Sequence, residues 1–278
     1  MTSGQPAIGQ ATIGPAAIGR RRGALGGRAL DLLLPALIVG VVIGLWQLSD
    51  SVFGIPVYML PRPSDFLPQF WLSLPQLWQN AVPTTLIILG GFLLGTAVAV
   101  PLALAIAASR LLERGLLPAL VVLQIAPKTI VAPLLIVWLG TGWMPQLALT
   151  TVMTFFPILV DAIAGFRAVD PRLYHVARSM GATRWQTFRH IRLPAAMPAI
   201  FSGLKIGMVS AITGAVVVEF VASNAGLGYL TMWASSHLDM ELMFAAILTT
   251  ALLGLVLNMI LVSLEMLLMP WMRHFRHG

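Results

Sequence analysis

The chain contains no cysteine, which excludes disulfide bonds, thiolate metal sites and cysteine nucleophiles and leaves the redox compartment open. Lysine is almost as scarce, because the sequence holds only Lys128 and Lys205. These follow Pro127 and Leu204, whereas a phosphate-binding loop of the GxxxxGKS or GxxxxGKT type needs a glycine before its lysine. The chain therefore cannot bind ATP through such a loop.

Motifs of metal-dependent and serine hydrolases are missing as well, since the sequence has neither HExxH nor GxSxG. Serines inside the apolar runs have no histidine at a plausible depth, and the histidines lack the spacing of metal ligands. We expect the histidines to be solvated; they are His175, His190, His237, His274 and His277. We therefore predict no catalytic residue, no metal site and no cofactor.

Charge is scarce too, because charged residues make up 10% of the chain, hydrophobic residues make up 58%, and mean hydropathy is +0.88. That composition is far too apolar for a soluble domain. A spanning helix needs roughly 20 mostly apolar residues. We therefore predict an all-α membrane protein with six transmembrane helices, at residues 30–49, 81–109, 115–140, 144–165, 197–222 and 241–268.

The pI near 11.0 could suggest a nucleic-acid partner, but the basic residues follow the positive-inside rule of membrane proteins instead. With a cytoplasmic N-terminus, six spans put fourteen of the 17 Lys and Arg residues on the cytoplasmic side. These fourteen are Arg20, Arg21, Arg22, Arg28, Arg110, Arg114, Arg167, Arg172, Arg178, Arg184, Arg189, Arg192, Arg273 and Arg276. We predict that both termini are cytoplasmic and that no nucleic acid is bound.

The regions around the first predicted span differ in composition. Residues 1–29 form a basic tail with recurring Ile-Gly pairs and too little apolar bulk for a core, so we expect disorder there. Residues 30–278 form the transmembrane domain. Within it, residues 54–78 are rich in proline and tryptophan, which predicts an outer segment along the membrane interface.

A basic amphipathic segment, residues 166–196, lies between the fourth and fifth predicted spans. Asp170 can cap a helix N-terminus, Pro171 suits the first helical position, and Gly181 suits a left-handed residue after the end. Apolar residues fall at i, i+3, i+4 and i+7 of this helix, and basic or polar residues take the other side. The apolar stripe consists of Leu173, Val176, Ala177 and Met180, and the other side carries Arg172, His175, Arg178 and Ser179.

A second short helix should follow, because Thr183 can cap it and Trp185 and Phe188 give it an apolar side. We expect Leu193-Pro194 to end it, since the residue before a proline is pushed away from helical geometry. The segment thus predicts a compact helical hairpin to which a soluble partner protein binds. The alternative is an ordinary basic loop on anionic lipid.

Ionisable residues inside the predicted spans are the candidates for a solute pathway, because their burial in a membrane is costly. Lys128 lies between Pro127 and Pro133, and these prolines should break the third span. The break would free backbone polar groups, which only a protein interior or a water-filled cavity tolerates. Asp161 and Glu219 are the other candidates. Pairing with a neighbour or snorkelling to the interface remains open for both.

Small residues recur every four positions in the second and fifth spans, a spacing that lets helices approach closely in lipid. They are Gly91, Gly95, Ala99, Ala103 and Ala107, and Gly203, Gly207, Ala211 and Ala215. They predict packing within the bundle or between two copies of the chain.

From Ala177 the chain reads A-x3-G-x9-I-x-L-P, which resembles the back part of the EAA signature of permease subunits of bacterial ABC importers. Further segments are similar to the nitrate, sulfonate and taurine branch, which includes permeases for pyrimidine precursors. These are LPRPSDF at 60–66, QIAPKTIVAPLLIVWLGTG at 124–142, FFPILVDAIAGFRAVDP at 155–171 and VVVEFVASNAGLGYL at 216–230. The resemblance covers the chain from about residue 35, but His175 and Val176 replace the glutamate and first alanine of EAA.

The resemblance implies a type I importer fold in the bacterial inner membrane. In it, residues 166–196 are the coupling segment that docks into a cytoplasmic ATPase subunit, through Arg172, Leu173, Val176, Ala177, Arg178, Met180 and Gly181. It also implies a homodimer, a periplasmic or lipid-anchored binding protein, and a small polar or anionic solute such as a sulfonate, nitrate, taurine or a pyrimidine. The alternative from another class is a six-span carrier or channel that works alone.

Overall fold

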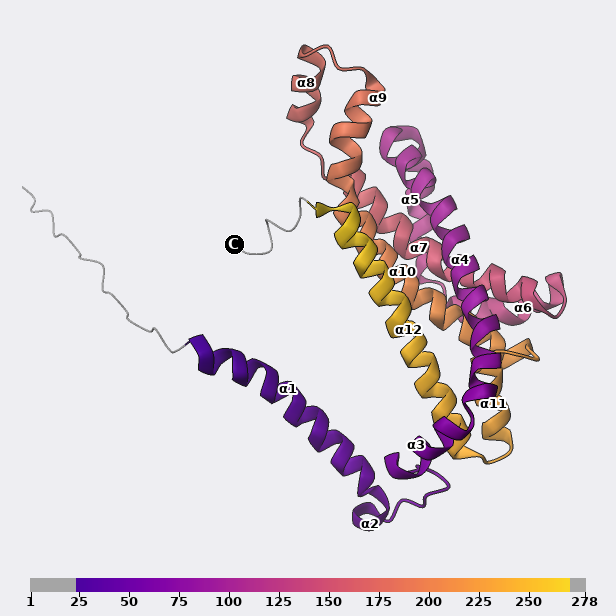
Figure 1. Ribbon diagram of the computed structural model, residues 1–278. Coiled ribbons are helices and arrows are strands. Elements are labelled where there is room, and N and C mark those ends of the chain that lie inside the picture. The colour runs from indigo at the N-terminus through magenta and orange to yellow at the C-terminus, as the bar shows by residue number, and fades with distance from the viewer. Residues whose placement is uncertain (1–23, 271–278) are drawn as a thin grey trace, which may run out of the picture.

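The computed structural model describes residues 24–270, and every regular element within that range is a helix, which confirms the all-α prediction (Figure 1). The α-helices are α1 (Ala24–Gln47), α2 (Ser49–Phe53), α3 (Pro63–Leu72), α4 (Leu74–Ala108), α5 (Arg110–Ile125), α6 (Val131–Leu139), α7 (Trp143–Arg167), α8 (Pro171–Ser179), α9 (Arg184–Thr187), α10 (Leu193–Ala222), α11 (Leu227–Ser236) and α12 (Met240–Leu268). A 3-10 turn, Lys128–Ile130, precedes α6, and a π-helical turn, Phe188–Arg192, joins α9 to α10.

Among the described residues, four helical stretches are long and apolar enough to cross a membrane: α4, α7, α12 and the continuous run Arg184–Ala222. A fifth span results if α5 and Lys128–Leu139 are counted together, although they bend by 78° at the break between them. In α1 the apolar stretch Leu33–Gln47 is shorter. The prediction of six spans therefore depends on α1.

Helix α7 lies at the centre of the bundle, packed between α4 and α10. The small residues of α4 face it, because a Cβ added at Gly95 would come within 3.0 Å of Thr154. The stripe on α10 does the same from the other side, where a Cβ at Gly207 would lie 2.8 Å from Ile158. Both stripes thus serve packing within the chain, one of the two uses that their spacing predicts.

Polar side chains within this packed region are satisfied locally. Thr150 and Thr154 are fully buried on α7 and donate their hydroxyl hydrogens to the carbonyl oxygens of Gln146 and Thr150, at 2.7 and 2.8 Å. In a membrane no water would replace these bonds, so an unpaired hydroxyl there would be costly. The buried apolar core around them comes from α4, α7, α10 and α12.

The bundle has two distinct ends (Figure 1). The hairpin of α8 and α9 stands beyond one end, and α2, α3 and α11 lie at the opposite end. From there α1 runs away from the other helices, and its side chains from Leu33 to Leu45 are mostly exposed. This arrangement places the basic hairpin and the proline-rich segment 54–78 far apart.

Three local predictions need correction. Pro194 does not end the second hairpin helix, because the wider π turn before it accommodates the missing N–H and the chain continues into α10. Pro133 does not break α6, since it lies in the first turn, where a backbone N–H has no partner inside the helix. Residues 24–29 begin α1 rather than ending a tail. The predicted disorder of residues 1–23 lies outside the described residues.

Candidate functional site

The hairpin between α7 and α10 is built by local capping bonds. The Asp170 side chain accepts a hydrogen bond from the Arg172 backbone N–H at 2.8 Å, and this starts α8. Gly181 has φ of +78°, a left-handed conformation that favours glycine, and it turns the chain. Thr183 and Gln186 then form a capping box with bonds of 2.8 and 3.2 Å. The Asp170 cap, the Gly181 turn and the Thr183 cap were predicted from the sequence, whereas the part of Gln186 in the capping box was not.

The apolar stripe of α8 has little cover from the rest of the chain. Ala177 is buried within the hairpin, but Leu173, Val176 and Met180 are 47%, 54% and 80% exposed. Arg172 and Arg178 are exposed as well. An apolar strip flanked by arginines is thus left open on a rigid element at the end of the bundle, as a docking surface requires.

One residue that the sequence analysis did not single out fastens the hairpin to the bundle. Arg192, in the π turn, donates a hydrogen bond from Nη2 to the carbonyl oxygen of Ala107 in the last turn of α4, at 2.9 Å. Its guanidinium also lies 5.8 Å from the centre of the Phe166 ring on α7. A cation is favoured at a helix C-terminus, so this contact ties α10 to the ends of two other helices.

Lys128 lies at the break between α5 and α6, as the sequence predicted. Its ammonium group donates a hydrogen bond to the carbonyl oxygen of Gln124 at 2.8 Å, near the C-terminal end of α5, and lies 5.1 Å from the centre of the Phe156 ring. Lys128 thus satisfies backbone freed by the break. A pathway role for this lysine stays a prediction.

The other two candidate pathway residues have different surroundings. Asp161 is half-buried on α7, facing the small residue Gly203 of α10. Glu219 is 1% exposed, and both of its carboxylate oxygens accept hydrogen bonds, from the Thr84 hydroxyl and from the Gly228 N–H, each at 2.7 Å. The structure brings neither of them together with Lys128, and their pathway roles also stay predictions.

Glu219 organises the turn that joins α10 to α11. The Thr84 hydroxyl, besides donating to Glu219, accepts a hydrogen bond from the Leu227 N–H at 2.8 Å. Asn80 accepts another from the Gly226 N–H at 3.0 Å. Gly226 has φ of +112° and lies directly against the carboxylate, so a side chain would meet both backbone strain and a clash. We call these residues the Glu219 network.

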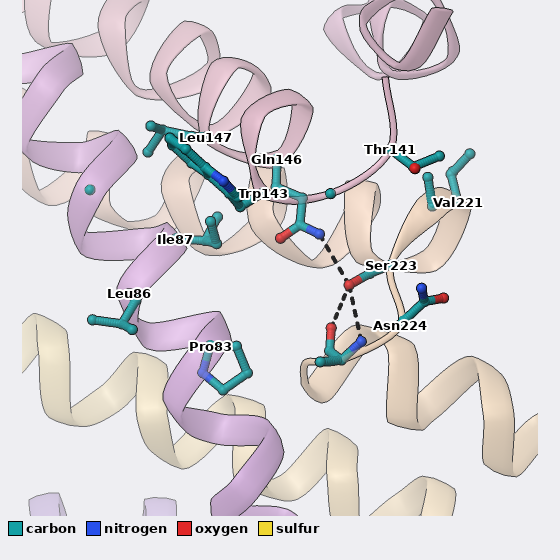
Figure 2. A pocket seen from close by; sticks show the side chains of 14 residues that line it. Pro83, Leu86, Ile87, Thr141, Trp143, Gln146, Leu147, Val221, Ser223 and Asn224 are labelled. Carbon is teal, nitrogen blue, oxygen red and sulfur yellow. Dashed lines mark hydrogen bonds between the residues drawn. The ribbon is translucent and has the colours of Figure 1, made fainter. Parts of the chain in front are cut away.

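A cavity of about 860 Å³ opens beside this turn, between α4, the start of α7 and the end of α10 (Figure 2). Gln146 on α7 is 7% exposed and donates a hydrogen bond to the Ser223 hydroxyl at 3.0 Å. Ser223 in turn donates to the Ala225 carbonyl oxygen at 2.5 Å. None of the predicted site residues lines this cavity. Sequence reasoning missed it because its wall combines three segments that lie far apart in the chain.

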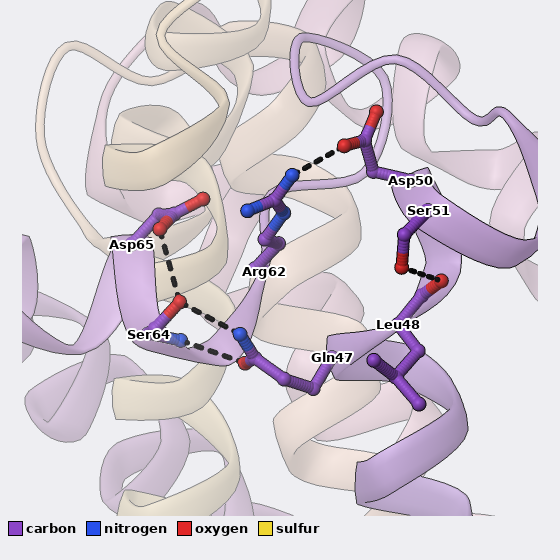
Figure 3. Close-up of polar contacts among 7 residues, drawn as sticks. All are labelled: Gln47, Leu48, Asp50, Ser51, Arg62, Ser64 and Asp65. Carbon is purple, nitrogen blue, oxygen red and sulfur yellow. Dashed lines mark hydrogen bonds and ion pairs between the residues drawn. The ribbon is translucent and has the colours of Figure 1, made fainter.

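The proline-rich segment is fastened to the end of α1 (Figure 3). Gln47 bonds to both the hydroxyl and the N–H of Ser64, at 2.9 and 3.2 Å, and Arg62 pairs with Asp50. Trp46 adds a bond from its indole N–H to the Pro61 carbonyl oxygen at 3.0 Å. The segment is therefore a platform held at the end of the bundle opposite to the hairpin.

Comparisons with known proteins agree with one another. Residues 91–274 match the family of binding-protein-dependent transport system inner membrane components. A riboflavin transport system permease protein of Chloroflexus aurantiacus is 38% identical over 81% of this chain and 85% of its own length. A formylaminopyrimidine transport permease protein of Halalkalibacterium halodurans is 30% identical over 88% and 98%. A putative aliphatic sulfonates transport permease protein of Escherichia coli is 32% identical over 88% and 92%.

The family match covers the hairpin, Glu219 and most of the central bundle, and the comparisons favour an importer subunit over a carrier that works alone. The chain belongs to the family of binding-protein-dependent transport system inner membrane components and is a permease subunit of an ABC importer for a small solute.

Proposed function

We propose that two copies of this chain form the membrane pathway of an ATP-driven importer, and that the hairpin of each copy docks on a cytoplasmic ATPase subunit. The exposed apolar strip of α8 carries this proposal, because a strip of this kind on a capped, rigid element suits a protein groove. The chain itself hydrolyses no ATP. Its part is to turn the closure of the ATPase pair into movement of the bundle.

Charge supports the orientation in this proposal. Arg172, Arg178 and Arg189 are exposed around the hairpin, and Arg167 pairs with Glu113 near the same end of the bundle. The positive-inside rule then places this end in the cytoplasm. With α1 as the first of six spans, both termini are cytoplasmic and the platform of α2 and α3 lies on the outer face.

The outer face is where the solute-binding protein would deliver its cargo. Residues 54–78 and 223–239 both lie at that end, and their backbones are fixed by the Gln47–Ser64 bonds and by the Glu219 network. The solute is a small polar or anionic organic molecule, since the relatives are named for riboflavin, formylaminopyrimidine and aliphatic sulfonates. The exposed apolar side chains of α1 leave a surface that lipid or the second copy would cover.

Affinity purification from native membranes tests the coupling role. The wild type should bring down an ATPase subunit in a fixed ratio, and Gly181→Arg should lose it while the permease stays folded. Gly140→Arg is a matched control at the other end, because Gly140 also has φ of +78° and open space around it. Equal recovery of the ATPase with both variants would contradict docking through the hairpin. Absence of any ATPase from the wild-type sample would contradict the whole assembly.

A further inference from the structure

Among the described residues, none that lines the cavity beside the Glu219 network is charged, although the chain as a whole carries a net charge of +7. One side is apolar and comes from Pro83, Leu86 and Ile87 of α4. The opposite side is polar but neutral, with hydroxyl and amide groups of Ser223 and Asn224. Figure 2 shows α4 and the turn that carries Ser223 and Asn224 on opposite sides of the open space.

Two side chains at the start of α7 give this cavity groups that can stack against and hydrogen-bond to a ligand. The indole of Trp143 belongs to the lining and is 60% exposed, so its ring is free to stack against a flat molecule. Gln146 is more than nine-tenths buried, and its amide nitrogen faces Ser223 while its oxygen turns the other way (Figure 2). A carboxamide offers both donors and an acceptor, and such groups match the ring carbonyls and ring N–H groups of a heterocycle.

The same cavity should bind an anion weakly. A sulfonate or nitrate that enters must shed water, and the wall supplies no cationic side chain to offset that loss. Lys128 cannot provide one, because it lines a different groove and donates its hydrogen bond to Gln124. The volume of about 860 Å³ lies within the roughly 300–1,000 Å³ usual for sites that hold small organic ligands.

We propose that this cavity is a solute-binding site in the permease itself and that it selects uncharged planar heterocycles over organic anions. The inference rests on the proposed function, since it places the site at the outer end of an importer's bundle. Stacking on Trp143, apolar contact with α4 and bonds to the Gln146 amide are the three sources of affinity.

The test uses the full chain in lipid nanodiscs, with lumichrome as the probe. Lumichrome is an uncharged three-ring heterocycle, and its fluorescence anisotropy rises on binding whether or not an indole is present. We expect a saturable rise beyond that of empty nanodiscs, unaffected by an excess of butane-1-sulfonate. Trp143→Ala should weaken binding about tenfold, from the loss of stacking and of apolar contact. Trp138→Ala is the matched control, because Trp138 is an exposed tryptophan of α6 outside the lining.

A second variant, Asn224→Ala, changes an exposed polar group of the wall and leaves the backbone bonds of the turn in place. It should weaken binding a fewfold. Absence of saturable binding, displacement by butane-1-sulfonate, or equal effects of Trp143→Ala and Trp138→Ala would each overturn the proposal. ATPase capture by the same preparations separates the two hypotheses, because lumichrome binding without capture contradicts only the assembly, and capture without binding contradicts only the cavity.

Discussion

At the hairpin end of the bundle, the bonds that shape the backbone join near neighbours, such as Asp170 with Arg172 and Thr183 with Gln186. At the opposite end they join distant parts of the chain, since Thr84 and Glu219 are 135 positions apart. The hairpin can therefore keep its shape with few contacts to the bundle, whereas the turn between α10 and α11 depends on the packing of α4 against α10. The contrast suits one end to external docking and the other to a site formed inside the fold.

The largest expected effect comes from breaking the Glu219 network. Glu219→Ala leaves the Gly228 N–H without its acceptor and the Thr84 hydroxyl with only the Asn80 carbonyl oxygen at 3.2 Å, and we expect a loss of about 4 kcal/mol in the free energy of unfolding from the two lost bonds to a carboxylate. SDS titration in bicelles measures this. Glu113→Ala removes an exposed ion pair with Arg167 and should cost less than about 1 kcal/mol. Similar losses for both variants would show that the network is no stronger than a surface contact.

Replacing a glycine of positive φ by alanine at each end compares the two ends directly by the loss in the free energy of unfolding. Gly226 has φ of +112° with the Glu219 carboxylate against it, so Gly226→Ala combines strain and overpacking, about 3 kcal/mol. Gly181 has φ of +78° and open space, so Gly181→Ala should cost only the strain, about 1 kcal/mol. The same titration gives both values. Equal losses would mean that the turn between α10 and α11 relaxes as freely as the hairpin.

The contact of Arg192 with α4 is an exception to the local character of the hairpin end. Its removal tests how far the shape of that end depends on the bundle. Arg192→Met should cost about 2 kcal/mol, because the Ala107 carbonyl oxygen loses a bond from a charged donor. Arg189→Met, at an exposed position of the same turn, is the control. Hydrogen exchange should rise in the last turn of α4 only in the first variant. Unchanged exchange there would contradict the tie between α10 and α4.

The smallest effect is expected from a single hairpin cap. Thr183→Ala removes the side-chain acceptor for the Gln186 N–H and should weaken the start of α9 by about 1 kcal/mol. Because the cap is local, hydrogen exchange should increase in residues 183–190 while the unfolding of the bundle hardly changes. Ser179→Ala, which removes another exposed hydroxyl of the hairpin, serves as the reference. A large fall in bundle stability would show that the hairpin is part of the core.

The features that could be predicted from the sequence are the ones that depend on local contacts. The caps at Asp170 and Thr183, the turn at Gly181 and the break at Pro127 depend on residues within a few positions, and all were predicted correctly. Pro133 and Leu193-Pro194 were misjudged because a proline in the first turn of a helix, or after a π turn, does not interrupt it.

Long-range relations were less accessible. The spacing of Gly95 and Gly207 indicated close packing, but only the structure shows that α7 is the partner of both helices. The bonds of Glu219 to Thr84, and the meeting of Trp143 with Ser223 and Leu86 around one cavity, depend on how helices are placed in space. No periodicity within a single helix carries that information.

The run Arg184–Ala222 is one uninterrupted helical stretch of 39 residues, which at 1.5 Å per residue is about 58 Å long. It begins in the hairpin and ends beside the Glu219 network and the cavity. Such a rod acts as a lever: a tilt of about 5° around one end displaces the other by about 5 Å, roughly one helical turn. A small rotation imposed on α9 could thus shift Ser223 relative to Gln146 and change the width of the cavity, with no local unfolding between them.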